Sequence, residues 1–309
     1  MAESFFVVAQ QVVILFILMS IGVLCNKIGW LDSKAVKSLT NIVLYFVTPC
    51  VIINSFNREM DRTLLRGLWV TALFSFGIQI FSIILASLVF RGNQNEENRV
   101  LRFATVFSNC GFMGLPLQQA LLGSVGAFFG AVYIAVFNVI VWTYGIWEMS
   151  GKKEEISLKK LVLNPGILGT AIGMIIFLLE IRLPEVVAAP VRYLACLNTP
   201  LPMIIIGYYL GNLTVGAFKK NLKQYLVIAL RLFVVPVAAI LAMYLLKVDS
   251  IIAVVCVIAC AAPTASITAM FATLFGKDAS LGAQMVSVST LISLISIPLV
   301  VTLARLLIP

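Results

Sequence analysis

The chain has 309 residues, of which 61% are hydrophobic and 11% are charged, and its mean hydropathy is +1.07. This composition excludes an ordinary soluble domain and indicates a polytopic membrane protein. The net charge of +9 does not indicate nucleic-acid binding, because the basic residues lie in short loops between apolar stretches. The six cysteines form no CxxC pair and histidine is absent, so we expect no metal site, no disulfide framework and no cofactor.

Ten apolar stretches are long enough to cross a bilayer core of ~30 Å, which takes ~20 helical residues. They are 5–25, 38–57, 66–90, 100–122, 124–147, 161–180, 186–209, 224–246, 250–275 and 279–306. The first lacks the basic flank of a secretory signal and is expected to be a retained span. The short polar loop 149–160 divides the chain into two halves, 1–148 and 161–309, so the predicted fold is all-α with ten transmembrane helices in two five-helix halves.

The two halves show a weak internal similarity. A shift of 151 residues places Thr48-Pro49 on Thr199-Pro200 and brings two helix-breaking segments into near register. Because each half has an odd number of spans, the second half enters the membrane in the opposite orientation. Related halves of this kind form an inverted repeat in which discontinuous helices cross near the midplane.

The first helix-breaking segment is 107–119, with Gly111, Gly114 and Pro116, and the second is 260–266, with Pro263. Glycine weakens a helix and proline removes a backbone donor, so we expect both spans to be broken. Unwound backbone at membrane depth is tolerated only where protein buries it or where it lines a wet cavity. A single break fits a proline kink packed on a neighbouring helix, whereas two breaks in corresponding halves point to a transporter binding site.

Half-helices that begin after Gly114 and after Pro263 would present unpaired N–H groups and about half a positive charge each. Two such ends facing one cavity would form an anion site, to which Asn109, Thr264 and Ser266 can add hydrogen bonds. The alternative for Asn109 and Ser266 is that they cap the orphan backbone groups of the broken helices.

Arg231 lies within the span 224–246, and all thirteen carboxylates lie in loops, termini or span ends. An arginine near the centre of a membrane helix costs ~2.5–3.5 kcal/mol on the insertion scale, so Arg231 must face polar groups. It can snorkel to the surface, hydrogen-bond the carbonyls of a broken helix, or hold an anionic substrate. These roles are compatible with one another.

The distribution of basic residues predicts the orientation. If the N-terminus lies outside, the inner loops carry 14 lysines and arginines and the outer loops carry 7. The positive-inside rule therefore places both termini outside and the central loop in the cytoplasm.

The segment Ser-Asn-Cys-Gly-Phe-Met-Gly-Leu-Pro-Leu at 108–117 resembles the fourth-helix crossover of the auxin efflux carrier family, which includes plant PIN proteins and bacterial malate and malonate permeases. Leu163-Asn164-Pro165, Thr48-Pro49 and Pro263 also match features of that family. The resemblance covers essentially the whole chain. The long cytoplasmic loop of many plant members and the double asparagine of their crossover are absent, which indicates a short prokaryotic member for which auxin is an unlikely substrate.

The resemblance implies crossed helices of the type found in NhaA and bile-acid symporters. It implies a scaffold of spans 1, 2, 6 and 7, a transport unit of spans 3–5 and 8–10, a homodimer formed through the scaffold, and elevator-type movement of a carboxylate across the cytoplasmic membrane. Asn109 matches the crossover asparagine that contacts the substrate carboxylate, and Pro263 matches the second crossover proline. The predicted substrate-binding set is Asn109, Gly111, Pro116, Pro263, Thr264, Ser266, Arg231, Pro49 and Asn198.

Three other functions are weighed against this one. An intramembrane enzyme would need a nucleophile with a base, paired aspartates or metal ligands, which the spans lack. A sodium- or proton-coupled carboxylate symporter remains an alternative, in which Glu148, Glu180 or Asp278 near the interfaces could carry a proton. The third function is that of a ligand sensor built on a transporter scaffold. With no acidic residue inside a span, the sequence favours uniport of an organic anion.

Overall fold

The computed structural model describes residues 2–92, 95–152, 154, 159, 162–212 and 222–308, and side chains from residue 6 onward. Within these ranges the chain is helical and contains no strand apart from one isolated β-bridge. Most of the predicted loop 149–160 lies outside the described residues, as do four lysines of the charge count, Lys153, Lys160, Lys219 and Lys220.

The first half of the chain begins with α1 (Ala2–Lys27). It continues with α2 (Ser33–Ile42), η1 (Val43–Val47), α3 (Thr48–Phe56), α4 (Arg62–Val89), α5 (Glu96–Val106), η2 (Cys110–Gly114), α6 (Leu115–Ile140), η3 (Val141–Gly145) and α7 (Ile146–Ser150), where η marks a π-helical turn. The side chains of Asp32, Asp61 and Asn95 accept backbone N–H groups at the starts of α2, α4 and α5. These caps fix where the helices begin, because the first N–H groups of a helix have no partner within it.

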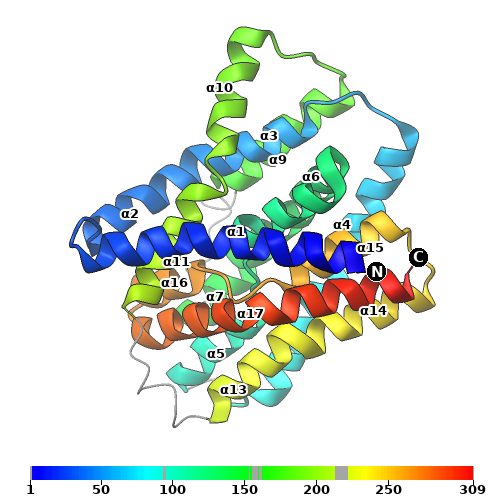
Figure 1. Cartoon of the computed structure of the whole chain (residues 1–309). Helices are drawn as coiled ribbons and strands as arrows, with labels where there is room; N and C mark the ends of the chain where they lie inside the picture. The colour runs from blue at the N-terminus through cyan, green and yellow to red at the C-terminus, as the bar shows by residue number, and fades with distance from the viewer. Residues whose placement is uncertain are drawn as a thin grey trace.

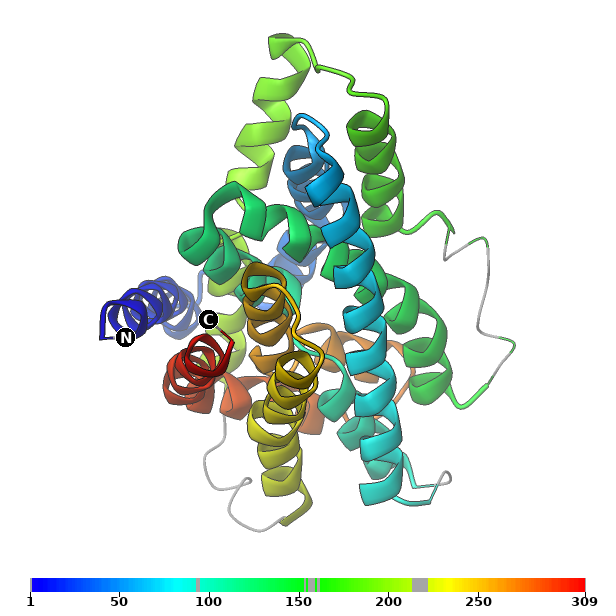
Figure 2. The ribbon, with the colours of Figure 1, turned by 90° about the vertical axis from the view of Figure 1, so that its right-hand side faces the viewer.

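The second half begins with α9 (Pro165–Leu178). It continues with α10 (Glu185–Cys196), α11 (Pro200–Gly211), α13 (Leu222–Ala229), η5 (Leu230–Val234), α14 (Val235–Leu245), α15 (Ser250–Ala261), α16 (Ile267–Leu274) and α17 (Ala279–Leu307). Both chain termini lie at the same end of the molecule (Figures 1 and 2). We call this the terminal end, and we call the opposite end, where α1 ends and α17 begins, the central-loop end.

Three π-helical turns precede prolines. The turns η1, η2 and η5 each end two residues before a proline, at Pro49, Pro116 and Pro236 respectively. In each turn, the backbone N–H of the residue directly before the proline donates to the carbonyl five residues earlier rather than four. Because proline has no N–H to offer the carbonyl four residues earlier, this wider turn lets the helix continue past it. Pro49 therefore lies inside a helical span that is widened rather than broken.

Seven helical segments are long and apolar enough to cross a membrane. They are Phe6–Lys27, Ser33–Phe56, Arg62–Val89, Cys110–Ser150, Glu185–Gly211, Leu222–Leu245 and Ala279–Leu307. Two further apolar helices, Pro165–Leu178 and Ser250–Ala261, are shorter. The chain is thus an all-helical polytopic membrane protein, while the count of ten spans and the inverted repeat stay predictions.

The longest of these segments, Cys110–Ser150, reverses direction at Gly123. Gly123 has φ 63° and ψ −148°, a conformation available essentially only to glycine. A Cβ atom built on Gly130 would lie 2.0 Å from Oε1 of Gln118. In a straight helix these two residues would be ~18 Å apart along the axis. The turn falls between the predicted spans 100–122 and 124–147.

Small residues allow two helix pairs to pack closely. A Cβ atom on Gly207 of α11 would lie 2.0 Å from the carbonyl oxygen of Met19 in α1, and one on Gly22 of α1 would lie 2.1 Å from the carbonyl of Ile204 in α11. In α9, a Cβ atom on Gly169 would lie 2.8 Å from the Cα atom of Pro49 in α3, so this glycine packs directly against a neighbouring helix. Glycine is required at these positions because the backbone of the neighbouring helix lies where a larger side chain would have to fit.

Gly207→Ala is expected to destabilise the protein, because the added methyl group would force α1 and α11 apart. Overpacking of this kind costs roughly 1–3 kcal/mol. The measurement is thermal unfolding of the purified protein in lipid nanodiscs. Gly77→Ala is the control, since a Cβ on Gly77 of α4 would meet nothing within 4 Å. An unchanged unfolding midpoint for Gly207→Ala would contradict the close α1–α11 contact.

Candidate functional site

The two predicted breaks meet in space. The chain leaves the helix after Val106, is extended at Phe107 and resumes helical structure at Cys110. An isolated antiparallel bridge pairs Ser108 with Thr264, 156 positions later in the chain. Two backbone hydrogen bonds of 2.7 and 2.9 Å form this bridge, the shorter one from the N–H of Asn109 to the carbonyl of Pro263. We call this meeting point, residues 107–109 and 262–266, the crossing.

The structure corrects where the first half-helix begins. The prediction started it after Gly114, but the helix begins with the π-turn at Cys110, and Pro116 lies in the first turn of α6. The glycines do not unwind the chain because the π-turn absorbs them, with the N–H groups of Met113 and Gly114 both bonded to the carbonyl of Asn109. The second half-helix begins at Ile267, after the extended residue that precedes Pro263.

Arg231 holds the C-terminal ends of two half-helices together. Its side chain is only 1% exposed. Nη1 donates hydrogen bonds of 2.9 Å to the carbonyls of Thr105 and Val106 at the end of α5, and Nη2 donates to the carbonyl of Cys260 at the end of α15. The alternative in which Arg231 bonds the carbonyls of broken helices is therefore confirmed. A guanidinium suits this position because it neutralises the negative ends of both helix dipoles.

Four buried polar groups close to the bridge have no hydrogen-bond partner among the described residues. They are Ser108 Oγ, Asn109 Nδ2, Ser266 Oγ and Thr268 Oγ1. Asn109 and Ser266 occupy the N-cap positions of η2 and α16, yet neither side chain makes a capping bond. The capping alternative for these two residues is therefore wrong. An unsatisfied buried polar group costs ~1–3 kcal/mol, so such groups mark a place where a ligand can bind.

The other predicted residues have structural contacts. The hydroxyl of Thr264 donates to the carbonyl of Ala104 at 3.1 Å, which ties the second break to α5. The amide of Asn198 donates to the carbonyl of Gly111 at 3.2 Å, which brings α10 and α11 to the crossing. Pro49 packs instead against Gly169.

Sequence reasoning missed a set of hydroxyls on α17. Ser289 Oγ accepts the N–H of Thr264 at 3.0 Å, and the Oγ of Ser293 lies 3.9 Å from the sulfur of Met113. Both serines are completely buried. The signal was the run of small polar residues in an otherwise apolar span, at 287, 289, 290, 293 and 296.

The acidic residues considered as proton carriers have other contacts. Glu148 is buried and pairs with Arg102 at 2.7 Å and with the hydroxyl of Tyr144 at 3.0 Å. Arg102, counted above as a loop charge, therefore lies within α5 and does not report on orientation. Asp278 caps α17 by accepting the N–H of Leu281.

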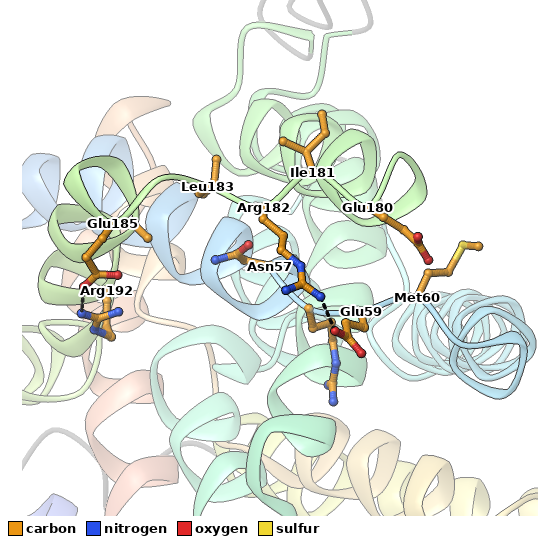
Figure 3. Close-up of a pocket in the computed structure, with 11 residues that line it drawn as sticks. Asn57, Glu59, Met60, Glu180, Ile181, Arg182, Leu183, Glu185 and Arg192 are labelled. Atoms are coloured by element: carbon orange, nitrogen blue, oxygen red, sulfur yellow. Dashed lines mark hydrogen bonds and ion pairs between the residues drawn. The ribbon is translucent and has the colours of Figure 1, made fainter.

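Glu180 lines a hollow at the terminal end. This cavity has a volume of about 530 Å³ and lies between the α3–α4 and α9–α10 connections. Figure 3 shows the residues that line it. Its ion pairs, Arg182 with Glu59 at 2.5 Å and Arg192 with Glu185 at 2.7 Å, are largely exposed. Exposed pairs of this kind contribute little to stability.

At the terminal end, contacts join α3 and α9 to α6. Phe128 of α6 lies 5.1 Å from Phe56 of α3 and 5.0 Å from Phe177 of α9, measured between ring centroids. Arg58, in the α3–α4 connection, donates a 3.0 Å hydrogen bond to the carbonyl of Ser124 and lies 5.4 Å from the ring centre of Phe128. We call these five residues the terminal clamp.

The model of a family described as "Membrane transport protein" matches residues 7–301. The chain belongs to this family. The resemblance to the auxin efflux carrier family is thereby confirmed. An uncharacterized transporter from Methanocaldococcus jannaschii is 24% identical over 300 residues, which cover 93% of this chain and 96% of the relative. An uncharacterized transporter from Methanothermobacter thermautotrophicus is 24% identical over 299 residues, covering 94% and 96%. This family member is therefore a membrane transporter and not an enzyme.

Proposed function

We propose that this transporter moves a small organic anion, a carboxylate, across the cytoplasmic membrane, and that the substrate binds at the crossing. The observation that carries the proposal is the electrostatic balance there. Two helix C-termini and two helix N-termini meet at the crossing, so their opposed dipole charges, each about half an elementary charge, cancel. The charge of Arg231 remains, and no carboxylate contacts its guanidinium among the described residues. A monoanion would neutralise it.

The donors at the crossing fit a carboxylate. Asn109 Nδ2 and the hydroxyls of Ser108, Ser266 and Thr268 are buried without partners, and each can donate to a carboxylate oxygen. The N–H groups at the starts of η2 and α16 add backbone donors. Arg231 favours the anion through its charge, because both of its Nη groups bond helix carbonyls, while its Nε has no partner among the described residues.

The mechanism we propose is an elevator movement of spans 3–5 and 8–10 against a scaffold of spans 1, 2, 6 and 7. At the terminal end the terminal clamp joins the two groups. At the central-loop end a cavity of about 200 Å³ lies between α11 of the scaffold and α17 of the transport unit. The larger cavity at the terminal end lies between the α3–α4 and α9–α10 connections and not between α11 and α17. The clamp at one end and the α11–α17 cavity at the other therefore favour a conformation open toward the central loop, which the positive-inside count assigns to the cytoplasm.

Uniport is the coupling we favour. An interior-negative membrane potential drives a monoanion outward by ~2.3 kcal/mol per 100 mV without a coupling ion. The pairing of Glu148 with Arg102 leaves that carboxylate without a role as a mobile proton carrier. Dimerisation through the scaffold and the placement of both termini outside are further parts of the proposal.

Asn109→Ala is expected to abolish the stabilisation that carboxylates give the purified protein. A ligand at ~100 times its dissociation constant adds ~2.7 kcal/mol to the folded state, which a thermal-shift screen of mono- and dicarboxylates detects. The Nδ2 atom of Asn109 has no hydrogen-bond partner among the described residues, so its removal should leave the unliganded protein equally stable. Asn41→Ala, an exposed asparagine of α2 that lines neither cavity, is the control.

If carboxylates still raised the unfolding temperature of Asn109→Ala, the proposed site at the crossing would be overturned. Counterflow of labelled carboxylate in proteoliposomes separates the alternatives, because a sensor would bind without exchange. Transport that requires a sodium or proton gradient and ignores voltage would support the ion-coupled alternative instead.

A further inference from the structure

We infer that the cavity between α11 and α17 is a second binding site, which takes a monocarboxylate with an apolar body before it reaches the crossing. The inference rests on the proposed function, because the ligand is of the same class. The cavity lies at the central-loop end, where α11 and the start of α17 run beside each other (Figure 1). Its walls are the side chains of Tyr208, Tyr209 and Asn212 on one side and of Ser280, Gln284 and Ser287 on the other.

A buried hydroxyl in this cavity lacks a partner. Ser287 is completely buried, lines the cavity and makes no hydrogen bond among the described residues. Its neighbours Ser289, Thr290 and Ser293 instead donate to carbonyls three or four residues back in their own helix. That back-bonding is the usual arrangement for a hydroxyl in a membrane helix. Ser287 therefore has its donor available to a ligand in the cavity.

The chemistry of the walls selects the class of ligand. Among the described residues no formally charged side chain lines the cavity, so each additional carboxylate adds a desolvation cost that no described counter-ion offsets. One carboxylate can accept hydrogen bonds from the Ser287 hydroxyl and the Gln284 amide, whose present contact with Ser280 is long at 3.4 Å. The rings of Tyr208 and Tyr209, with centroids 5.5 Å apart, offer an apolar surface. This combination favours a monoanion with an apolar body over a dicarboxylate.

Further hydroxyl groups follow Ser287 along α17 in the direction of the crossing. Ser287 is followed two residues later by Ser289, which accepts the N–H of Thr264, and then by Ser293, which contacts Met113. Residues three and four apart lie on one face of a helix, so Ser287, Thr290 and Ser293 form a line of hydroxyls from the cavity to the crossing. A carboxylate released from the cavity would thus move along hydroxyl groups rather than along bare hydrocarbon.

The test is equilibrium binding of radiolabelled benzoate to the full chain in nanodiscs, with succinate as competitor. We expect two benzoate sites per chain in the wild type. Ser287→Ala should weaken one of them roughly threefold to tenfold, the effect of one lost hydrogen bond. Ser296→Ala is the matched control, because Ser296 is also a buried, unpartnered serine of α17 but does not line the cavity. Succinate should not displace benzoate from the Ser287-dependent site.

A second readout locates the ligand. In a variant whose accessible cysteines Cys25, Cys50 and Cys196 are replaced by serine, Ser280→Cys should react with a small maleimide, because Ser280 lines the cavity and is exposed, and benzoate should slow the reaction. The second site would be overturned if Ser287→Ala bound benzoate with the affinity of the wild type. It would also be overturned if benzoate did not change the rate of maleimide labelling. If Ser287→Ala weakens binding while Asn109→Ala has no effect, the second site stands and the crossing fails as a substrate site.

Discussion

Replacement of Arg231 by methionine is expected to destabilise the protein strongly rather than to weaken ligand binding alone. Methionine fills a similar volume but donates no hydrogen bond, so the carbonyls of Thr105, Val106 and Cys260 would lose their shared donor. Each buried carbonyl left unpaired costs ~1–3 kcal/mol, which gives roughly 3 kcal/mol or more in total. The negative ends of α5 and α15 would also face each other without a cation between them.

The measurement is the thermal unfolding midpoint in nanodiscs without ligand, which we expect to fall by on the order of 5 °C or more. Arg231→Lys keeps the charge but replaces the planar guanidinium with one ammonium group, so we expect a smaller decrease in the unfolding midpoint than for Arg231→Met. Arg66→Met removes an exposed arginine of α4 and serves as the control. A normal midpoint for Arg231→Met together with lost carboxylate binding would assign Arg231 to the substrate instead of the helix ends.

The location of the breaks shows what local sequence can and cannot predict. Pro263 forces the preceding residue into an extended conformation, so the second break follows from the sequence. The first break lies upstream of the glycines that suggested it. Phe107 to Asn109 is held out of the helix by backbone bonds to Pro263 and Ala265, which lie in the other half of the chain. No pattern within one span reveals such a partner.

The partners of Arg231 illustrate the same limit. The sequence predicts that an arginine in an apolar span must face polar groups, and the carbonyls of a broken helix were among the expected partners. It does not predict that one guanidinium binds both half-helices, because that requires the ends of α5 and α15 to meet. The Ser287 cavity was missed for a related reason: only the packing of α11 against α17 shows which unpartnered serine lines a cavity.

Arg58→Ala is expected to shift the transporter away from the conformation described above. Arg58 connects the end of α3 to the Gly123 turn through its bond to Ser124 and its contact with Phe128. An elevator movement has to break these contacts, so they stabilise one end state only. Burial lowers the pKa of Arg58 from its ordinary value, but an arginine stays charged at neutral pH, so the cation–π contact persists.

The hydrogen bond and the cation–π contact together contribute about 2–3 kcal/mol, which corresponds to roughly a 30- to 140-fold change in the equilibrium between end states. Labelling of Ser280→Cys by maleimide reports this shift, because Ser280 is an exposed residue of the α11–α17 cavity, and labelling should slow when Arg58→Ala opens the terminal end and closes that cavity. Arg62→Ala removes an exposed arginine four residues away and should leave labelling unchanged. If maleimide labels the cavity cysteine equally fast with and without Arg58→Ala, the terminal clamp does not separate two transport conformations. Such a result would leave the crossing as a binding site and count against its movement past the scaffold.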